Sequence, residues 1–159
     1  LGLAPRGRQR GRAVVSLAQL LAAHEGVLVL DAASTRVQVG LVRRAAPAVW
    51  RASDDEAAKA LFRLTTEVLD AAGWTLDRVP AFVFGAGPGS LLGVRTVAMA
   101  LRTWLVLAPR PVHAFRSLEL LAHGLAGEAA WRPSLVVADA RRGTWHAVAV
   151  AADGTVGPL

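Results

Sequence analysis

The glycine-rich segment of this sequence is Gly85-Ala-Gly-Pro-Gly-Ser-Leu-Leu-Gly-Val-Arg95, and it lies between two runs of different periodicity. The run before it, Ala81-Phe-Val-Phe84, is short, apolar and aromatic, which is typical of a buried strand. The residues after it keep helical spacing to about Leu107. We therefore predict a tight turn that leads from a strand into the N-terminus of a helix.

Two roles fit this turn. Glycines leave backbone N–H groups accessible and a helix N-terminus carries partial positive charge, so the turn is suited to an anion held near Gly87, Gly89 and Ser90. Alternatively, the glycines only allow the strand to turn tightly into a closely packed helix, with Ser90 as its N-cap. The local chemistry favours the second role by a small margin.

Composition describes a folded chain of 159 residues, because 53% of them are hydrophobic and 19% are charged. The longest apolar run, 97–108, is interrupted by Arg102 and is too short to span a membrane. The sequence has no cysteine, which excludes thiol catalysis, disulfides and thiolate metal sites. We expect a soluble, cytoplasmic protein without membrane contact.

The net charge of +6 is concentrated near the beginning of the sequence, where four arginines precede the first acidic residue, Glu25. They are Arg6, Arg8, Arg10 and Arg12. Residues 1–26 are predicted to be a flexible, arginine-rich leader, which is consistent with an RNA contact or with a targeting segment. Because the sequence lacks an initiating methionine, an upstream extension or a processed end explains the leader equally well.

Two segments follow one pattern, in which a strand ends at an aspartate and a turn leads into an alternating strand. The elements are strands 27–30 and 37–42 around Asp31, and strands 134–138 and 144–151 around Asp139. An aspartate-led hairpin opens each half of an actin-like or hexokinase-like fold. We therefore predict an α/β chain with a first lobe over 27–132 and only the start of a second lobe over 133–159.

Two helices are predicted to cover the sheet of the first lobe. One follows a capping box at Ser53-Asp-Asp-Glu56 and ends at Gly73, and the other follows the glycine-rich turn. Beside the apolar stripe of each helix lies a second set of side chains that does not follow the stripe. This set contains Phe62, Thr65 and Leu69 on the first helix and Arg95, Met99 and Arg102 on the second. A further helix is predicted after Ser117, which is expected to be its N-cap.

Four segments, taken together and in this order, resemble the bacterial tRNA threonylcarbamoyladenosine biosynthesis family TsaB, also called YeaZ. They are Val27-Leu-Val-Leu-Asp-Ala-Ala-Ser-Thr35, the glycine-rich segment, Ser117-Leu-Glu-Leu-Leu-Ala122 and Asp139-Ala-Arg-Arg-Gly143. The resemblance implies an actin-like (ribonuclease H-like) fold with a mixed sheet flanked by helices. It also implies a non-catalytic scaffold that supports the threonylcarbamoyl transferase paralogue TsaD in N6-threonylcarbamoyladenosine (t6A) modification of tRNA.

The resemblance further implies where partners bind. The family's partner surface is formed by the helices of the first lobe, here about 54–72 and 91–107, so Phe62, Thr65, Leu69, Arg95, Met99 and Arg102 become the candidate contacts. A TsaE-like ATPase is a further expected partner, tRNA is contacted only indirectly, and the isolated chain is expected to be a homodimer.

Departures from the family pattern weaken the case for nucleotide binding. The His-Ser pair expected before the first of these helices is replaced by Ala57-Ala58, and the Phe-Thr pair after the glycine turn by Leu91-Leu92. Phosphate-binding hairpins of actin-like ATPases have glycine after the aspartate, whereas alanine follows both Asp31 and Asp139. We expect no cofactor in the isolated chain, and ATP with Mg²⁺ only in the complex.

A weak set of anion or nucleotide contacts remains: Asp31, Ser34, Thr35, Gly87, Gly89, Ser90, Asp139, Arg141 and Arg142. Asp31 and Asp139 would hold Mg²⁺ through water if they met across a cleft, but aspartates at strand ends more often cap turns. No histidine pair has zinc-site spacing, and no nucleophile elbow surrounds Ser90. The alternatives to a scaffold are a nucleotide-dependent phosphotransferase of the same fold and a degenerate, self-associating paralogue.

Overall fold

The computed structural model of the chain describes residues 15–127, 132–141 and 143–157. In chain order the elements are α1 (Leu17–Ala23), β1 (Gly26–Asp31), β2 (Val37–Arg43), β3 (Val49–Ser53), α2 (Ala57–Ala72), a short 3₁₀ turn (Leu76–Arg78), β4 (Phe82–Gly85), α3 (Leu91–Leu107), β5 (Val112–Phe115), α4 (Ser117–Ala126), β6 (Ser134–Arg141) and β7 (Thr144–Val150). Of the predicted flexible leader, 1–26, the residues before 15 lie outside the described residues, whereas its described part contains α1 and the first residue of β1.

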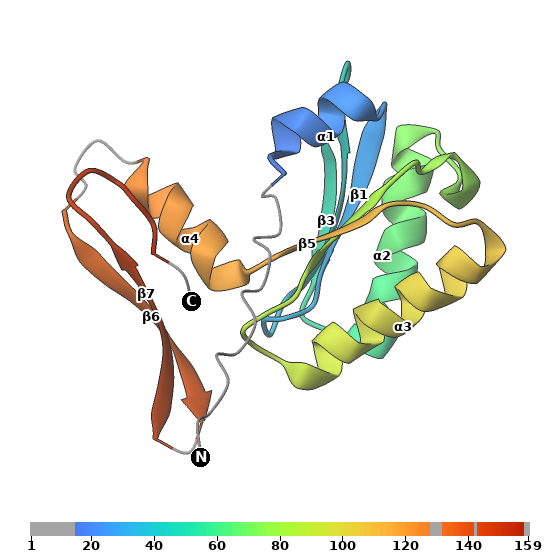
Figure 1. Cartoon of the computed structure of the whole chain (residues 1–159). Coiled ribbons are helices and arrows are strands. Elements are labelled where there is room, and N and C mark those ends of the chain that lie inside the picture. Colours follow the sequence, from blue (N-terminus) through green and yellow to red (C-terminus); the bar gives the residue numbers. More distant parts are fainter. Residues whose placement is uncertain (1–14, 128–131, 142, 158–159) are drawn as a thin grey trace, which may run out of the picture.

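A five-stranded mixed sheet in the order β3-β2-β1-β4-β5 forms the larger part of the molecule. β1 pairs antiparallel with β2, β2 pairs antiparallel with β3, and β1, β4 and β5 run parallel. In β1 successive residues point to opposite faces, so Leu28 and Leu30 face α2 and α3, whereas Val27 packs with Leu20 of α1. α2 and α3 therefore cover one face of the sheet and α1 lies on the other (Figure 1). The predicted mixed sheet flanked by helices is confirmed.

A second, two-stranded sheet is formed by the antiparallel pair β6 and β7, and α4 packs on it. Leu118 and Ala122 of α4 meet Val136, Val148 and Val150 of the hairpin in a separate apolar cluster. The hairpin and α4 lie beside the larger sheet (Figure 1). After β7 the chain turns back, and Val156 forms a bridge with Val150.

Two predicted helix caps are wrong. Ser53 is the last residue of β3, where its hydroxyl donates to Asp55, and α2 begins at Ala57 behind Glu56, which makes no side-chain cap. Ser117 is the first residue of α4, and the N-cap is Arg116. Both serines lie one or more positions away from the point where the chain changes conformation, so their hydroxyls cannot reach the exposed amides.

Two other helix boundaries are confirmed. Ser90 is the N-cap of α3, since its hydroxyl accepts from the Gly93 amide at 3.2 Å. Gly73 ends α2 in the left-handed conformation, with φ of 65°. Among the described residues, no helix is both long enough and apolar enough to span a membrane.

Candidate functional site

The glycine-rich turn packs directly against the turn between β1 and β2. A Cβ on Gly89 would lie 1.9 Å from the carbonyl oxygen of Ala33, and a Cβ on Gly93 would lie 1.8 Å from that of Ala32. A residue with a Cβ cannot be accommodated at either position, because the Cβ would overlap with these oxygens. Gly89 also has a positive φ of 156°. The glycines are therefore required for close contact between two backbone segments.

Three backbone amides at the start of α3 have partners within the protein. The Ser90 amide donates to the carbonyl of Ala33, the Gly93 amide donates to the Ser90 hydroxyl, and the Val94 amide donates to the Ser90 carbonyl. An anion bound through these three amides would have to displace these hydrogen bonds. The geometry favours the structural role of the glycine turn over the anion-binding role.

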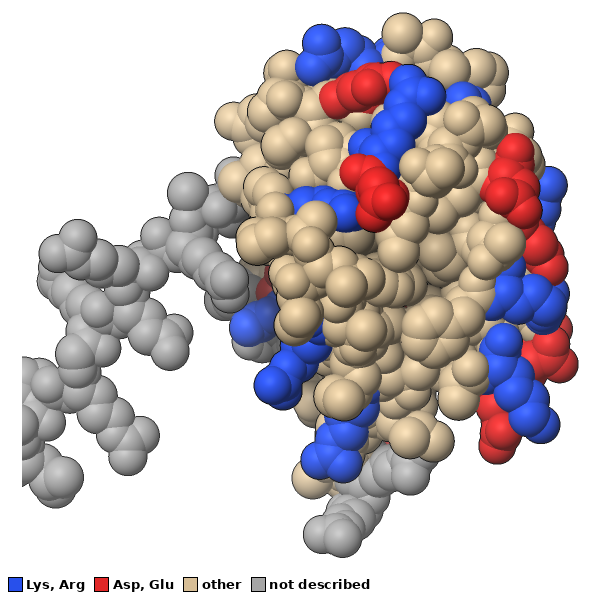
Figure 2. Space-filling view, turned by 90° about the vertical axis from the view of Figure 1, so that its right-hand side faces the viewer, with Lys and Arg blue, Asp and Glu red and all other residues tan. Residues whose placement is uncertain are grey.

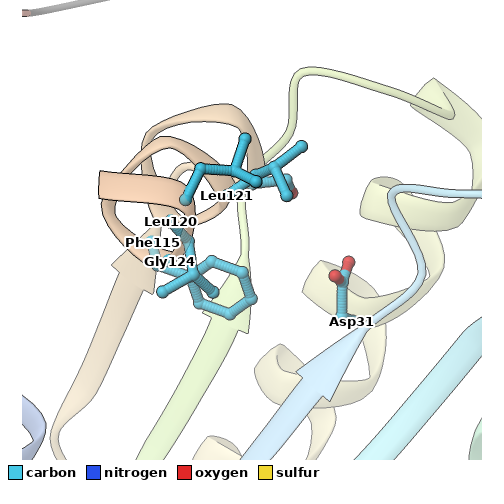
Figure 3. A pocket seen from close by; sticks show the side chains of 7 residues that line it. Asp31, Phe115, Leu120, Leu121 and Gly124 are labelled. Carbon is cyan, nitrogen blue, oxygen red and sulfur yellow. The ribbon is translucent and has the colours of Figure 1, made fainter. Parts of the chain in front are cut away.

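Asp31 lies at the end of β1 and closes the β1–β2 turn, because its carboxylate accepts from the Ala33 amide at 2.8 Å. It also borders a hollow of about 500 Å³ between the end of the sheet and α4 (Figure 3). The hollow is lined by Asp31, Phe115, Ser117, Leu120, Leu121, Gly124 and Leu125. This lining carries one carboxylate and no basic group, so its charge is unsuited to a phosphate.

The other members of the weak anion set do not gather around this hollow. Ser34 is engaged with its own turn, since its hydroxyl donates to the Arg36 carbonyl at 2.9 Å. Asp139 is an exposed residue of the second sheet and is not among the residues that line the hollow. The Arg141 side chain and Arg142 lie outside what the structure describes. In the described part of the chain, no group of three or more histidine and acidic residues is placed to hold a metal.

A second hollow, of about 330 Å³, lies between α2 and α3. It is lined by Ala58 and Phe62 of α2 and by Leu92, Arg95, Thr96, Met99, Ala100 and Thr103 of α3. Phe62 is 50% exposed, Met99 61% and Leu92 73%, so the apolar lining is open to solvent. We call this feature the α2–α3 groove. It contains three residues of the predicted partner surface: Phe62, Arg95 and Met99.

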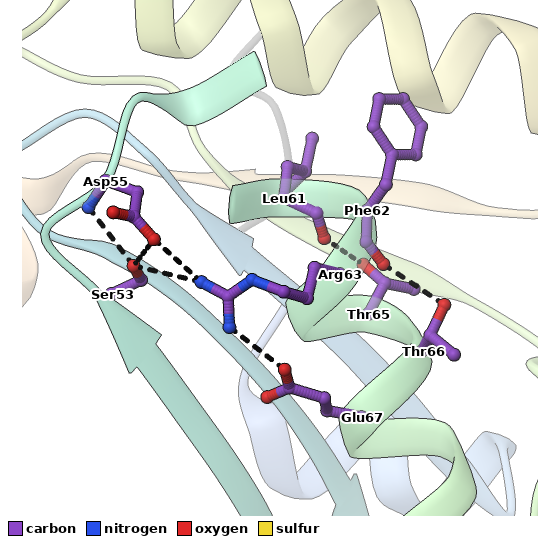
Figure 4. Close-up of polar contacts among 8 residues, drawn as sticks. All are labelled: Ser53, Asp55, Leu61, Phe62, Arg63, Thr65, Thr66 and Glu67. Carbon is purple, nitrogen blue, oxygen red and sulfur yellow. Dashed lines mark hydrogen bonds and ion pairs between the residues drawn. The ribbon is translucent and has the colours of Figure 1, made fainter. Parts of the chain in front are cut away.

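Two residues of that predicted surface, Thr65 and Leu69, are buried in this structure. Thr65 is 5% exposed and its hydroxyl donates to the Leu61 carbonyl at 2.8 Å (Figure 4). Leu69 is also 5% exposed and lies within the main core. The residues lie on the sheet-facing side of α2, because the buried stripe of this helix is wider than the sequence pattern indicated. Neither is available to a partner.

Charged side chains border α2 on the side away from α3. Arg63 forms ion pairs with Asp55 and Glu67, both at 2.9 Å, as Figure 4 shows. The Ser53 hydroxyl, and after it Arg63, holds the pKa of Asp55 below its ordinary value, while Glu67 raises the pKa of Arg63. Figure 2 shows a broad surface area without charged side chains, with charged residues along its borders.

Arg95 and Arg102 differ from Arg63 in their ion pairing. Both are exposed on α3, and no described carboxylate lies within ion-pair distance of either. Leu92, Thr96 and Thr103, which sequence reasoning did not select, complete the groove. Their spacing along the sequence indicates that they share a face of α3 with Met99. Only the way in which α2 packs beside α3 shows that a hollow opens at this face.

Comparison with known protein families gives a match over more than half of the chain. The sequence model of a family described as "TsaD: tRNA N6-adenosine threonylcarbamoyltransferase" matches residues 51–156. No curated protein sequence matches the chain significantly.

Two solved structures from Pseudomonas aeruginosa are similar to this one. YeaZ has 26% sequence identity and a TM-score of 0.71 over 84% of this chain and 63% of its own. A protein described as uncharacterized, with similarity to peptidase YeaZ, gives the same identity, TM-score and coverage of this chain, and 62% coverage of its own. The chain thus spans less than two thirds of either structure.

Proposed function

The chain belongs to the TsaD family, and from this membership we propose that it is a non-catalytic scaffold subunit in t6A modification of tRNA. Its structure is YeaZ-like and its fold actin-like, as the resemblance of four sequence segments implied. The proposed partner is the threonylcarbamoyl transferase paralogue, in which catalysis would take place.

The observation that carries this proposal is the α2–α3 groove. A water-soluble protein rarely exposes neighbouring large apolar side chains without a partner. Phe62, Leu92 and Met99 are each at least half exposed around one hollow. The groove therefore has the character of a protein-binding surface.

The aspartate-bordered hollow and the glycine turn give less support to the alternative, a nucleotide-dependent phosphotransferase. The amides of Ser90, Gly93 and Val94 are engaged, and the lining of the hollow has no cation to balance a phosphate. We propose that the isolated chain needs no cofactor. A TsaE-like ATPase as a further partner, indirect contact with tRNA and homodimer formation in isolation also remain proposals.

Titration calorimetry with the transferase paralogue of the same organism tests the scaffold role. Phe62→Asp and Met99→Asp place a charge in the groove and should remove binding. Leu135→Asp is a matched control, because Leu135 is 62% exposed on β6, close to the 61% of Met99, and it lies away from the groove. Absence of binding by the unaltered chain, or equal losses in all three variants, would contradict the proposal.

A further inference from the structure

The exposed face of α3 combines apolar side chains with positive charge only. Its exposed apolar residues are Leu91, Leu92, Met99, Val106 and Leu107, with exposed fractions between 61% and 84%. Its charged residues are Arg95 and Arg102, and α3 contains no acidic residue. A partner that covers this face must therefore supply both apolar surface and negative charge.

The two arginines lie on one stripe of α3. Residues seven apart are separated by almost two turns and about 10 Å along a helix axis, and Met99 falls between them on the same side. Arg95 also lines the α2–α3 groove. One positive charge therefore lies at the groove, and Arg102 lies almost two turns further along the same stripe of α3.

The opposite wall of the groove is made by Ala58 and Phe62 of α2. The ring of Phe62 meets Trp104 edge to face, which fixes its orientation toward α3. Small or polar side chains at Thr96, Ala100 and Thr103 leave the floor of the groove open. A row of apolar side chains from a third helix fits such a channel between two helices.

The charges indicate what lies beside that apolar row. An arginine covered by a partner without an opposite charge loses hydration, so a stable complex needs carboxylates close to Arg95 and Arg102. A second copy of this chain that docked through α3 would instead bring its own Arg95 and Arg102 to the same surface, and the like charges would repel each other.

We infer that the α2–α3 groove binds an amphipathic helix of the partner whose apolar stripe is bordered by two carboxylates about seven residues apart. The inference rests on the proposed function and adds to it the chemistry of the partner segment. The apolar stripe enters the hollow between Phe62 and Met99, and the carboxylates pair with Arg95 and Arg102.

Two designed helical peptides test this chemistry without the natural partner. Both carry leucines at helical spacing, and they differ only at two positions seven residues apart, which are glutamate in one peptide and lysine in the other. Fluorescence anisotropy at low salt should show at least about tenfold tighter binding of the glutamate peptide, with the difference shrinking at high salt. Equal binding of the two peptides would overturn the inference.

Charge reversal on the protein gives the second arm. The double variant Arg95→Glu/Arg102→Glu should prefer the lysine peptide, whereas Arg36→Glu/Arg132→Glu changes the net charge equally at exposed sites outside the groove and should keep the original preference. If the first double variant is not folded by circular dichroism, Arg95→Gln/Arg102→Gln replaces it and should remove the preference. A retained preference in either groove variant would overturn the inference.

The transferase paralogue separates this inference from the proposed function. Binding that is lost in Phe62→Asp but unchanged by Arg95→Glu/Arg102→Glu would keep the scaffold role and overturn the acidic helix. A strong preference for the glutamate peptide without any binding of the paralogue would keep the acidic helix and contradict the scaffold role. If the chain bound phosphatidylserine-containing vesicles through these arginines but bound neither peptide, the acidic helix would be overturned in favour of a lipid surface.

Discussion

Phe62 of α2 and Trp104 of α3 meet edge to face, with ring centroids 6.2 Å apart and ring planes at 88°. Trp104 is buried and also stacks on Phe82 of β4 at 5.6 Å, whereas Phe62 is half exposed. The three aromatic rings thus form a continuous series of contacts from the sheet through α3 to the wall of the α2–α3 groove. The groove is held in shape by the core beneath it.

This relationship predicts different costs for truncating the two rings. Trp104→Ala should lower the free energy of unfolding by about 3–5 kcal/mol, because it leaves a cavity between α3 and the sheet. Phe62→Ala should cost about 1 kcal/mol, since its ring is half exposed. Urea unfolding measures both values. A similar loss in both variants would show that Phe62 belongs to the core and not to a binding surface.

The glycine turn predicts a strong dependence on residue size at Gly93. Gly93→Ala should destabilise the protein by at least about 1–3 kcal/mol, because the added Cβ collides with the Ala32 carbonyl. The matched control is Gly124→Ala in α4, where nothing lies within 4 Å, and it should stabilise by about 0.5–1 kcal/mol. Thermal unfolding compares the two. Tolerance of alanine at Gly93 would contradict close packing of the two turns.

Arg44 is expected to stabilise the end of α1. Its guanidinium donates to the carbonyls of Leu21, Ala22 and His24, which are otherwise exposed at the C-terminus of the helix. Arg44→Ala should speed amide hydrogen exchange in α1 and lower stability by about 1–2 kcal/mol. Arg51→Ala, which removes one hydrogen bond to a neighbouring carbonyl in β3, is the control and should leave α1 unchanged.

The Asp55 carboxylate predicts a small dependence of stability on acid pH. Hydrogen bonds from the Ser53 hydroxyl and from Arg63 lower its pKa in the folded state below the ordinary value of 3.8. A lowered folded-state pKa stabilises the fold above pH 3.8, and this contribution is lost as the pH falls through the folded value. Asp55→Asn should therefore have a lower Tm than the unaltered chain at pH 6 but nearly the same Tm at pH 2. An equal difference at both values would exclude this titration.

Nucleotide binding gives a direct test of the aspartate-bordered hollow. The isolated chain should give no binding heat with ATP and Mg²⁺, because the amides of Ser90, Gly93 and Val94 are engaged and the hollow has no basic lining residue. Saturable binding that is lost in Asp31→Asn would favour the phosphotransferase alternative. Ser34→Ala serves as a control for nonspecific effects at the same turn.

Local sequence signals predicted most elements of the fold. The strand–turn–helix around the glycine segment, the Ser90 cap and the Gly73 end of α2 depend on neighbouring residues, and each is confirmed. The caps expected at Ser53 and Ser117 are wrong because a serine near a helix start acts as a cap only at one position, which tertiary packing decides.

The candidate site was predicted only in part. Helical spacing placed Phe62, Arg95 and Met99 away from the apolar stripes, and the structure brings all three to one groove. The same spacing also selected Thr65 and Leu69, which are buried because the sheet covers more of α2 than its stripe indicates.

The sequence by itself determined the strand, turn and helix of the glycine segment, the hairpin led by Asp31 and the resemblance to the TsaB family, because these depend on periodicity and on residues close together in the chain. The second hairpin differs from its prediction, because β6 continues past Asp139 to Arg141. Tertiary structure alone decided that the glycine turn packs against the β1–β2 turn, to which the Ser90 amide donates, and that α2 and α3 leave a groove between them. Both facts depend on contacts between segments distant in sequence, whose separation no local pattern encodes.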